Sequence, residues 1–272
     1  MKNEHKNIDW HTGFISAIHL ELADFKDYLE FHTEYPLSSK PLEIDCVIIK
    51  KPKDIVIDKN FASFFRETNI IEYKSPNSYL SVKDFYKVYA YVCLYSSLER
   101  GVLTEKTITF IVGHTPKKLI KYLESKLKFI VEEKSPGIYT VIGDIFPIQI
   151  IDNRKLSPEE NIWLKDLTNK LVSSEWKNIQ NEADKRKENS VWLKIYLDVI
   201  TRANNDSFKE INNMGLGIVE LLEEMGALDE MKEKGGKRRD LVIAKRLLEK
   251  GYPIDEIVSI TDLEPEKVRE LV

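Results

Sequence analysis

Two charged residues, Glu72 and Lys74, lie one residue apart within the apolar stretch NIIEYKSPNSYL. If this stretch is a strand, alternate side chains point to the same face, so the carboxylate and the ammonium project together while Ile71 and Tyr73 face the other way. A further charged residue, Asp45, lies inside the β-rich stretch LEIDCVIIK. Antiparallel pairing of the two strands would bring both carboxylates together with the lysine beside them.

These three side chains suit metal-dependent hydrolysis of a phosphodiester bond. Two carboxylates suit Mg²⁺, which keeps several waters and prefers phosphate oxygens for its remaining positions. The metal lowers the pKa of a bound water and stabilises charge on the phosphate, while an adjacent lysine orients the nucleophile or offsets developing charge. We therefore expect a Mg²⁺ or Mn²⁺ cofactor. The alternative is an exposed, salt-bridged sheet edge with no chemistry.

The composition is typical of a globular protein. The 272 residues, of which 42% are apolar and 32% charged, can bury a sizeable core in one large or two modest domains. No window holds the roughly 18 uninterrupted apolar residues of a membrane helix. The N-terminal stretch MKNEHKNIDW also lacks the apolar core of a signal peptide. We expect a cytoplasmic protein with no membrane partner.

The cysteines, the net charge and the histidines exclude some kinds of site. Cys46 and Cys93 lie in apolar stretches without CxxC or Cys/His ligand spacing, which predicts reduced core thiols and neither a zinc site nor a disulfide framework. The net charge of −4 gives no global attraction to nucleic acid, although a local basic patch could bind phosphates. Four histidines lie on different expected elements with no shared spacing, so they are assigned no chemistry: His11, His19, His32 and His114.

The periodicity of apolar residues predicts an α/β core. In FISAIHLELADF, Phe14, Ile18, Leu22 and Phe25 recur at intervals of three and four, which indicates one face of a helix. The expected helices are at 14–25, 81–98 and 116–127, with a short one at 61–66, and the expected strands are at 28–37, 42–50, 69–74 and 107–112, with further short strands in 128–151. This order of elements predicts a mixed sheet.

The region after Asn153 is expected to be helical from Ser157 onward, which divides the chain into an α/β core, 1–153, and a helical region, 154–272. Its last part predicts short helices joined by tight turns, as in a helix-turn-helix arrangement. The basic loop that precedes them, KEKGGKRRD, holds three residues that could contact a DNA backbone: Lys237, Arg238 and Arg239. The alternative is a small helical module that packs on the core or on a second copy of the chain. Five acidic residues argue against a groove-reading face: Asp255, Glu256, Asp262, Glu264 and Glu266.

Asp45 followed by Glu72-Tyr73-Lys74 matches the D…(D/E)xK pattern of the PD-(D/E)XK nuclease superfamily. The stretches EYPLSSKPLEIDCVIIKK, NIIEYKSPNSYLSVKDFYKVYAYVCLY and IAKRLLEKGYPIDEIVSITDLEPEKVREL resemble the recombination-promoting nuclease and PD-(D/E)XK-family transposase group. The resemblance covers most of 14–151 and the C-terminal stretch. It implies a restriction-endonuclease-like core of α-β-β-β-α-β order. The chain departs from the motif at Ile44, where the family pattern has proline.

The resemblance also implies roles for individual residues. Asp45 and Glu72 would be metal ligands and Lys74 the catalytic lysine. Superfamily members often add a glutamate from the first helix, for which Glu21 is the candidate. Glu34 on the first strand competes for that role, and a solvated helix position is the alternative for Glu21.

The resemblance favours a metal-dependent endonuclease that acts on nucleic acid, in particular DNA, and is linked to recombination or mobile elements. Lys87, one helical turn before Tyr91, could touch a phosphate, or it packs its stem along the helix. The alternative function is a noncatalytic binding or scaffold protein that keeps the nuclease fold. The intact set of Asp45, Glu72 and Lys74 favours the enzyme.

Overall fold

The computed structural model describes residues 8–36, 43–50, 55–98, 105–185 and 191–213. The chain forms two compact units, Met1–Gly215 and Leu216–Val272, and every described residue belongs to the first unit. The expected boundary near Asn153 falls inside that first unit. The expected helix-turn-helix module and its basic loop, with Lys237, Arg238 and Arg239, lie outside the described residues.

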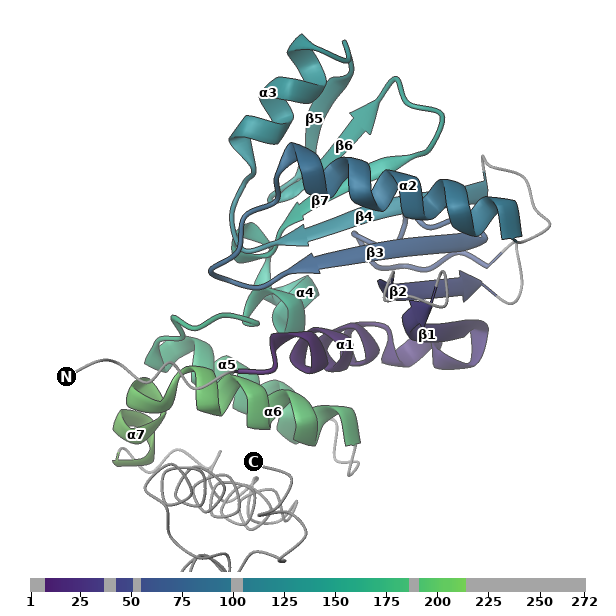
Figure 1. The fold of residues 1–272 in the computed structure, drawn as a ribbon. Helices are drawn as coiled ribbons and strands as arrows, with labels where there is room; N and C mark the ends of the chain where they lie inside the picture. The colour runs from purple at the N-terminus through teal and green to yellow at the C-terminus, as the bar shows by residue number, and fades with distance from the viewer. Residues whose placement is uncertain (1–7, 37–42, 51–54, 99–104, 186–190, 214–272) are drawn as a thin grey trace, which may run out of the picture. The chain divides into compact units, whose positions relative to one another are not determined.

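The fold is α/β and is built on one mixed sheet of seven strands, as the sequence predicts (Figure 1). The strand order is β1-β2-β3-β4-β7-β6-β5. The first three strands pair antiparallel, β3, β4 and β7 run parallel, and β5 and β6 return antiparallel. The strands are β1 (Leu29–Pro36), β2 (Glu43–Lys50), β3 (Thr68–Lys74), β4 (Lys106–Val112), β5 (Ile130–Ser135), β6 (Ile138–Ile142) and β7 (Ile148–Asp152).

The first helix differs from its expected bounds of 14–25. It begins at Trp10 because Asp9 caps it, with the carboxylate accepting from the backbone N–H of Thr12 at 3.0 Å. It ends at Glu21, and a 3₁₀ segment follows. The helical segments are α1 (Trp10–Glu21), η1 (Ala23–Tyr28), α2 (Val82–Leu98), α3 (Lys117–Ser125), η3 (Asn153–Lys155), α4 (Pro158–Lys165), α5 (Ser173–Lys185), α6 (Val191–Ala203) and α7 (Asn205–Asn213).

Two smaller expectations are wrong. The stretch 61–66 forms turns rather than a short helix, because Asn60 uses its side-chain oxygen to accept from the backbone N–H of Phe61 at 2.7 Å. Cys46 is a buried thiol as expected, but Cys93 is exposed. Cys93 lies on the solvent-facing side of α2, so the apolar residues next to it in the sequence do not mean that it is buried.

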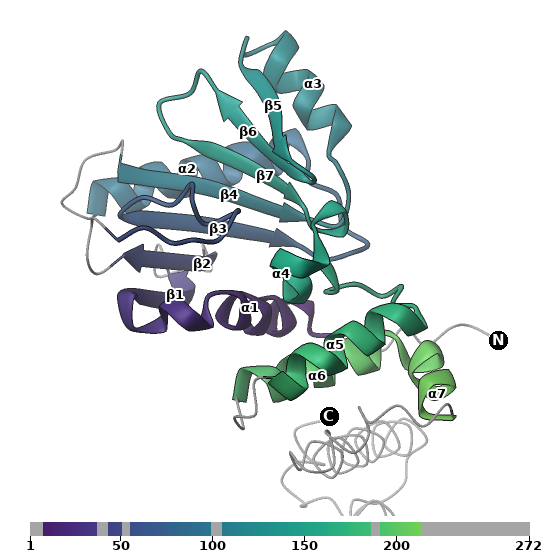
Figure 2. The same cartoon turned by 180° about the vertical axis from the view of Figure 1, so that it is seen from behind.

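Helices cover both faces of the strand β3. Val88 and Val92 of α2 pack with Ile70 and other apolar residues of the sheet in one core cluster. On the other face, the ring of Phe14 in α1 stacks on the ring of Tyr73, with centroids 4.7 Å apart. Figures 1 and 2 show α2 in front of the parallel strands in one view and behind them in the other. Alternate side chains of β3 therefore meet different helices.

Within the first unit, α4 and α6 pack against α1. His19 of α1 stacks on Trp192 of α6 with ring centroids 3.8 Å apart, and Trp163 of α4 meets Tyr196 of α6 edge to face. The helices α4 to α7 agree with the expectation of helix from Ser157 onward as far as Asn213. None of the described helices is both long and apolar enough to cross a membrane.

Candidate active site

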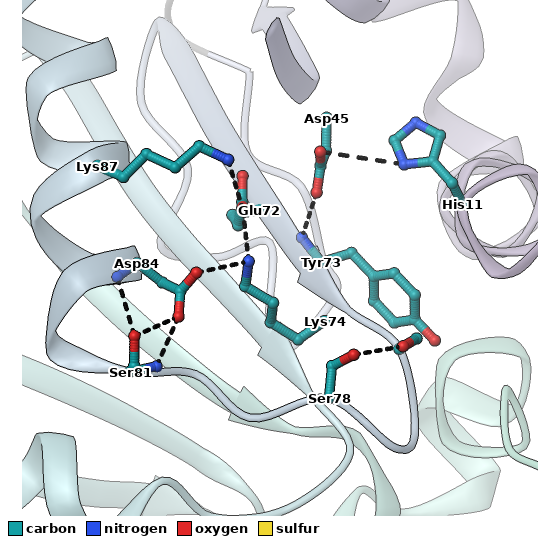
Figure 3. A network of polar contacts seen from close by, with 10 residues as sticks. His11, Asp45, Glu72, Tyr73, Lys74, Ser78, Ser81, Asp84 and Lys87 are labelled. Atoms are coloured by element: carbon teal, nitrogen blue, oxygen red, sulfur yellow. Dashed lines mark hydrogen bonds and ion pairs between the residues drawn. The ribbon is translucent and has the colours of Figure 1, made fainter. Parts of the chain in front are cut away.

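Asp45 and Glu72 lie on adjacent antiparallel strands, as the sequence predicts. The register ends with Cys46 opposite Ile71, and Asp45 and Glu72 are the next residues along the two strands. The regular pairing stops there, and Asp45 Oδ2 accepts from the backbone N–H of Tyr73 at 2.9 Å (Figure 3). The carboxylate thus takes an acceptor position that a backbone carbonyl would hold in a continued ladder.

Lys74 lies on the same face of β3 as Glu72, and its ammonium contacts two carboxylates. Its Nζ is 2.9 Å from Glu72 Oε1 and 3.0 Å from Asp84 Oδ1. Glu72 is buried, with 3% of its surface exposed, whereas Lys74 is partly exposed. In the network of polar contacts that Figure 3 shows, Glu72 and Lys74 are in direct contact, whereas the Asp45 carboxylate meets β3 at the backbone N–H of Tyr73, between these two residues.

Asp84 is a member of this network that the sequence did not assign to the site. The sequence predicts it only as part of the start of α2, and it has that role too, because it accepts from the backbone N–H of Ser81 at 2.9 Å. Its backbone N–H in turn donates to Ser81 Oγ at 3.2 Å, which completes a capping box. The other carboxylate oxygen holds Lys74. The rigid start of α2 therefore positions the lysine.

Burial and the neighbouring charges shift the pKa values of Glu72 and Lys74. Burial raises the pKa of Glu72, and the nearby Asp45 carboxylate raises it further, against the opposing effect of Lys74. Burial alone would lower the pKa of Lys74, but the carboxylates of Glu72 and Asp84 outweigh it and leave the pKa raised. Lys74 is consequently a fixed positive charge at neutral pH and not a proton acceptor.

Two further residues reach the network from outside β2 and β3. The Nζ of Lys87, on α2, lies 3.8 Å from Glu72 Oε1 and 5.2 Å from the ring centroid of Tyr91, so a phosphate contact and packing along the helix are both compatible with its position. His11 Nδ1 lies 4.0 Å from Asp45 Oδ1. His11 could not be assigned to the site from its neighbours in the sequence, because only the packing of α1 brings it close to β2.

Glu21 is not brought to the other carboxylates. One of its oxygens lies 2.5 Å from Lys59 Nζ, and the other accepts from the backbone N–H of Leu164 at 3.0 Å. Burial raises its pKa, and Lys59 opposes that rise. The pair lines a pocket of about 380 Å³ that α4 and α5 border. The cause is the placement of α1, which packs on the face of β3 that carries Tyr73 and not Glu72.

The strand register gives Glu34 a different position from Glu21. The residues on either side of Glu34 in β1 pair with the residues on either side of Asp45 in β2. Glu34 is therefore opposite Asp45 in register. Three acidic residues thus occupy neighbouring positions on three consecutive strands.

The acidic pair of Asp45 and Glu72 has the character of a cation site. Their mutual repulsion contributes to the raised pKa of Glu72, and a divalent cation between two carboxylates would remove that repulsion. Among the residues that the structure describes, no three His, Cys, Asp or Glu side chains are grouped so as to hold a metal ion. Two carboxylates with waters and a substrate phosphate can satisfy Mg²⁺.

No protein-family model, no curated protein and no solved structure matches the chain. The resemblance to the PD-(D/E)XK nucleases therefore depends on the motifs in the sequence, together with the order of the strands.

Proposed function

We propose that the chain is a metal-dependent nuclease that hydrolyses phosphodiester bonds, with DNA as its substrate and a restriction-endonuclease-like core. The observation that supports this most directly is the pairing of β2 with β3, where Asp45 accepts from the backbone N–H of Tyr73, next to Glu72, while Lys74 contacts the Glu72 carboxylate. The order of helices and strands around these residues agrees with the order that the resemblance implies. A role in recombination or mobile elements is part of the same proposal.

In this proposal the residues of the network divide the tasks of metal binding, charge stabilisation and positioning. Asp45 and Glu72 hold the cation, and bound Mg²⁺ supplies charge stabilisation and an activated water. Lys74 keeps its proton because two carboxylates surround it, so it donates to a phosphate oxygen and offsets the charge that develops there. Asp84 and Glu72 together fix the direction of the Lys74 ammonium.

A noncatalytic protein with the nuclease fold is the alternative, and the ion pair itself favours it. Lys74 already neutralises Glu72 at 2.9 Å without a metal ion. A scaffold protein could retain such a pair for its structure alone. The two proposals differ in whether Mg²⁺ binds and whether DNA is cut.

Cleavage of supercoiled plasmid DNA tests the proposal. The wild-type protein with Mg²⁺ or Mn²⁺ should nick or linearise the plasmid, EDTA should stop the reaction, and Lys74→Ala should cut far more slowly than the wild type. Agarose electrophoresis over time measures all three. Activity that is equal in Lys74→Ala and wild type would point to a contaminating nuclease or a site elsewhere in the chain. No cleavage by wild type with either metal, on DNA or on RNA, would favour the scaffold protein.

We also propose Glu34, and not Glu21, as the third carboxylate of the site. Glu34→Gln should weaken Mg²⁺ binding by about tenfold or more, because a charged ligand is lost. Glu21→Gln is the matched control, which should leave Mg²⁺ affinity unchanged, because Glu21 is paired with Lys59 away from the other carboxylates. Calorimetric metal titration of both variants measures these effects. Loss of Mg²⁺ affinity in Glu21→Gln alone would reverse the assignment.

A further inference from the structure

A large aromatic side chain, Tyr79, is 77% exposed in the turn that follows β3. Its ring meets His114 edge to face, with centroids 4.3 Å apart and an angle of 62° between the planes. His114 follows β4 by two residues, and β3 and β4 run parallel. The two rings therefore lie at the carboxyl ends of neighbouring parallel strands, which is where α/β sheets commonly bind ligands.

The turn formed by residues 75–78, just before Tyr79, is held in place by several contacts. The backbone N–H of Ser78 donates to the carbonyl of Ser75 at 2.8 Å, and the two hydroxyls are 2.8 Å apart. Pro76 packs so closely on Gly113 that a Cβ at Gly113 would lie 3.1 Å from the Pro76 Cα. These contacts hold the turn from both sides. The ring of Tyr79 is therefore presented to solvent by the surrounding structure.

The turn also connects Tyr79 to the proposed active site. Tyr79 precedes Ser81 by two residues, which limits the separation of their backbones to about 7 Å. The backbone N–H of Ser81 donates to the same Asp84 carboxylate that holds Lys74 at 3.0 Å. Figure 3 shows Ser78 at the end of this turn and Ser81 at the start of α2. The segment that carries Tyr79 is therefore connected to the ammonium of Lys74 through Ser81 and Asp84.

Exposed lysines follow each of the two rings along the chain, at the starts of α2 and α3. Lys83 and Lys87 lie in the first turns of α2, and both are exposed. Lys117 and Lys118 begin α3, three and four residues after His114, and they are exposed as well. Lysines around an exposed aromatic ring are typical of surfaces that bind single-stranded nucleic acid, where the bases stack and the phosphates meet cations.

We propose that Tyr79 and His114 form a stacking platform for an unpaired nucleobase, so that the substrate is single-stranded or locally unpaired nucleic acid. The inference rests on the proposed nuclease function for its biological sense. The edge contact with His114 fixes the tyrosine ring and leaves ring surface for a base. The bases of an intact duplex are stacked on each other and are not available to the ring. The platform thus selects unpaired strands and holds them beside Lys74.

Binding of fluorescein-labelled oligonucleotides, measured by anisotropy in EDTA, tests the platform without cleavage. Tyr79→Ala should weaken binding of oligothymidylate by about tenfold or more, because stacking on one base is lost. Tyr79→Phe should bind like wild type, since the ring is retained. Tyr28→Ala removes another exposed tyrosine, 44% exposed on η1, and should bind like wild type. Duplex DNA should bind Tyr79→Ala and wild type equally.

The outcomes separate this proposal from the nuclease itself. Equal binding of single strands by Tyr79→Ala and wild type, an equal loss on duplex, or no binding of single strands by wild type would each overturn the platform. If wild type cuts no nucleic acid but Tyr79→Ala still loses single-strand affinity, the nuclease proposal fails and the platform stands. A parallel series with oligouridylate shows whether the platform prefers DNA or RNA. Circular dichroism confirms that each variant is folded.

Discussion

Glu72→Ala is expected to abolish DNA cleavage at ordinary Mg²⁺ concentrations because it removes a charged metal ligand. Lys74→Ala should behave differently. Both carboxylates remain, so much of the metal affinity should persist, while the cleavage rate falls by about 10² to 10⁴ because a positioned charged group is lost. Lys74→Arg should not restore the rate, because a planar guanidinium cannot occupy the position of a compact ammonium between Glu72 and Asp84.

Calorimetric Mg²⁺ titration beside plasmid cleavage distinguishes the two defects. The chain offers a matched control in Glu132 and Lys134, which have the same spacing on β5 and also form an ion pair. Both control side chains are about half exposed, so alanine at either position should change neither metal affinity nor cleavage. If Glu72→Ala and Lys74→Ala cut as fast as an active wild type, the pair at 72 and 74 would be a structural ion pair like the control.

The same comparison shows how far the sequence alone could lead. The spacing Glu-x-Lys occurs on both β3 and β5, and alternation predicts a strand in each case. Only burial distinguishes them, because Glu72 is 3% exposed and lies beside Asp45, while Glu132 faces solvent. The apolar residues around Glu72 indicate a buried strand in the sequence itself. Because the stretch around Asp45 also predicts a strand, the pairing of β2 with β3 could be predicted from local patterns.

The third carboxylate and the positioning residue were not predictable in the same way. Glu21 was expected near the metal because the resemblance implies a glutamate from the first helix and Glu21 lies near its expected end, but its partners are Lys59 and the backbone of Leu164 in α4, far away in sequence. For Asp84, the sequence indicated only a helix cap. The second oxygen of a capping carboxylate can contact any neighbour, and here that neighbour is Lys74. Both assignments depend on the packing of helices, which local periodicity does not specify.

Asp166→Asn is expected to stabilise the protein at high pH. Asp166 ends α4, is 1% exposed, and its Oδ2 has no hydrogen-bond partner among the described residues. Burial raises its pKa to about 8, and the carboxylates of Glu175 and Glu21 contribute to the rise. The ordinary aspartate pKa is 3.8. The folded protein therefore keeps a proton that the unfolded chain releases between these two pH values.

The sign of the pH dependence follows from proton linkage. Where the folded state binds more protons than the unfolded state, the free energy of unfolding decreases as the pH rises. Asp166 should thus make its full contribution to the free energy of unfolding below about pH 4. This contribution should be lost progressively as the pH rises to about 8. Asparagine carries no charge in either state. As the pH rises from 5 to 9, the free energy of unfolding of the variant should therefore increase by roughly 2–4 kcal/mol relative to that of the wild type.

Urea denaturation of wild type and Asp166→Asn at pH 5 and pH 9 measures this difference directly, because all other titrating groups are common to the two proteins. Asp184→Asn, an exposed aspartate on α5, is the matched control and should follow wild type at both pH values. Parallel stability curves for Asp166→Asn and wild type would mean that Asp166 is ionised in the folded protein. The nearby Tyr196 hydroxyl, whose pKa rises with burial and with the Asp166 charge, would then be the first group to examine as its hydrogen-bond donor.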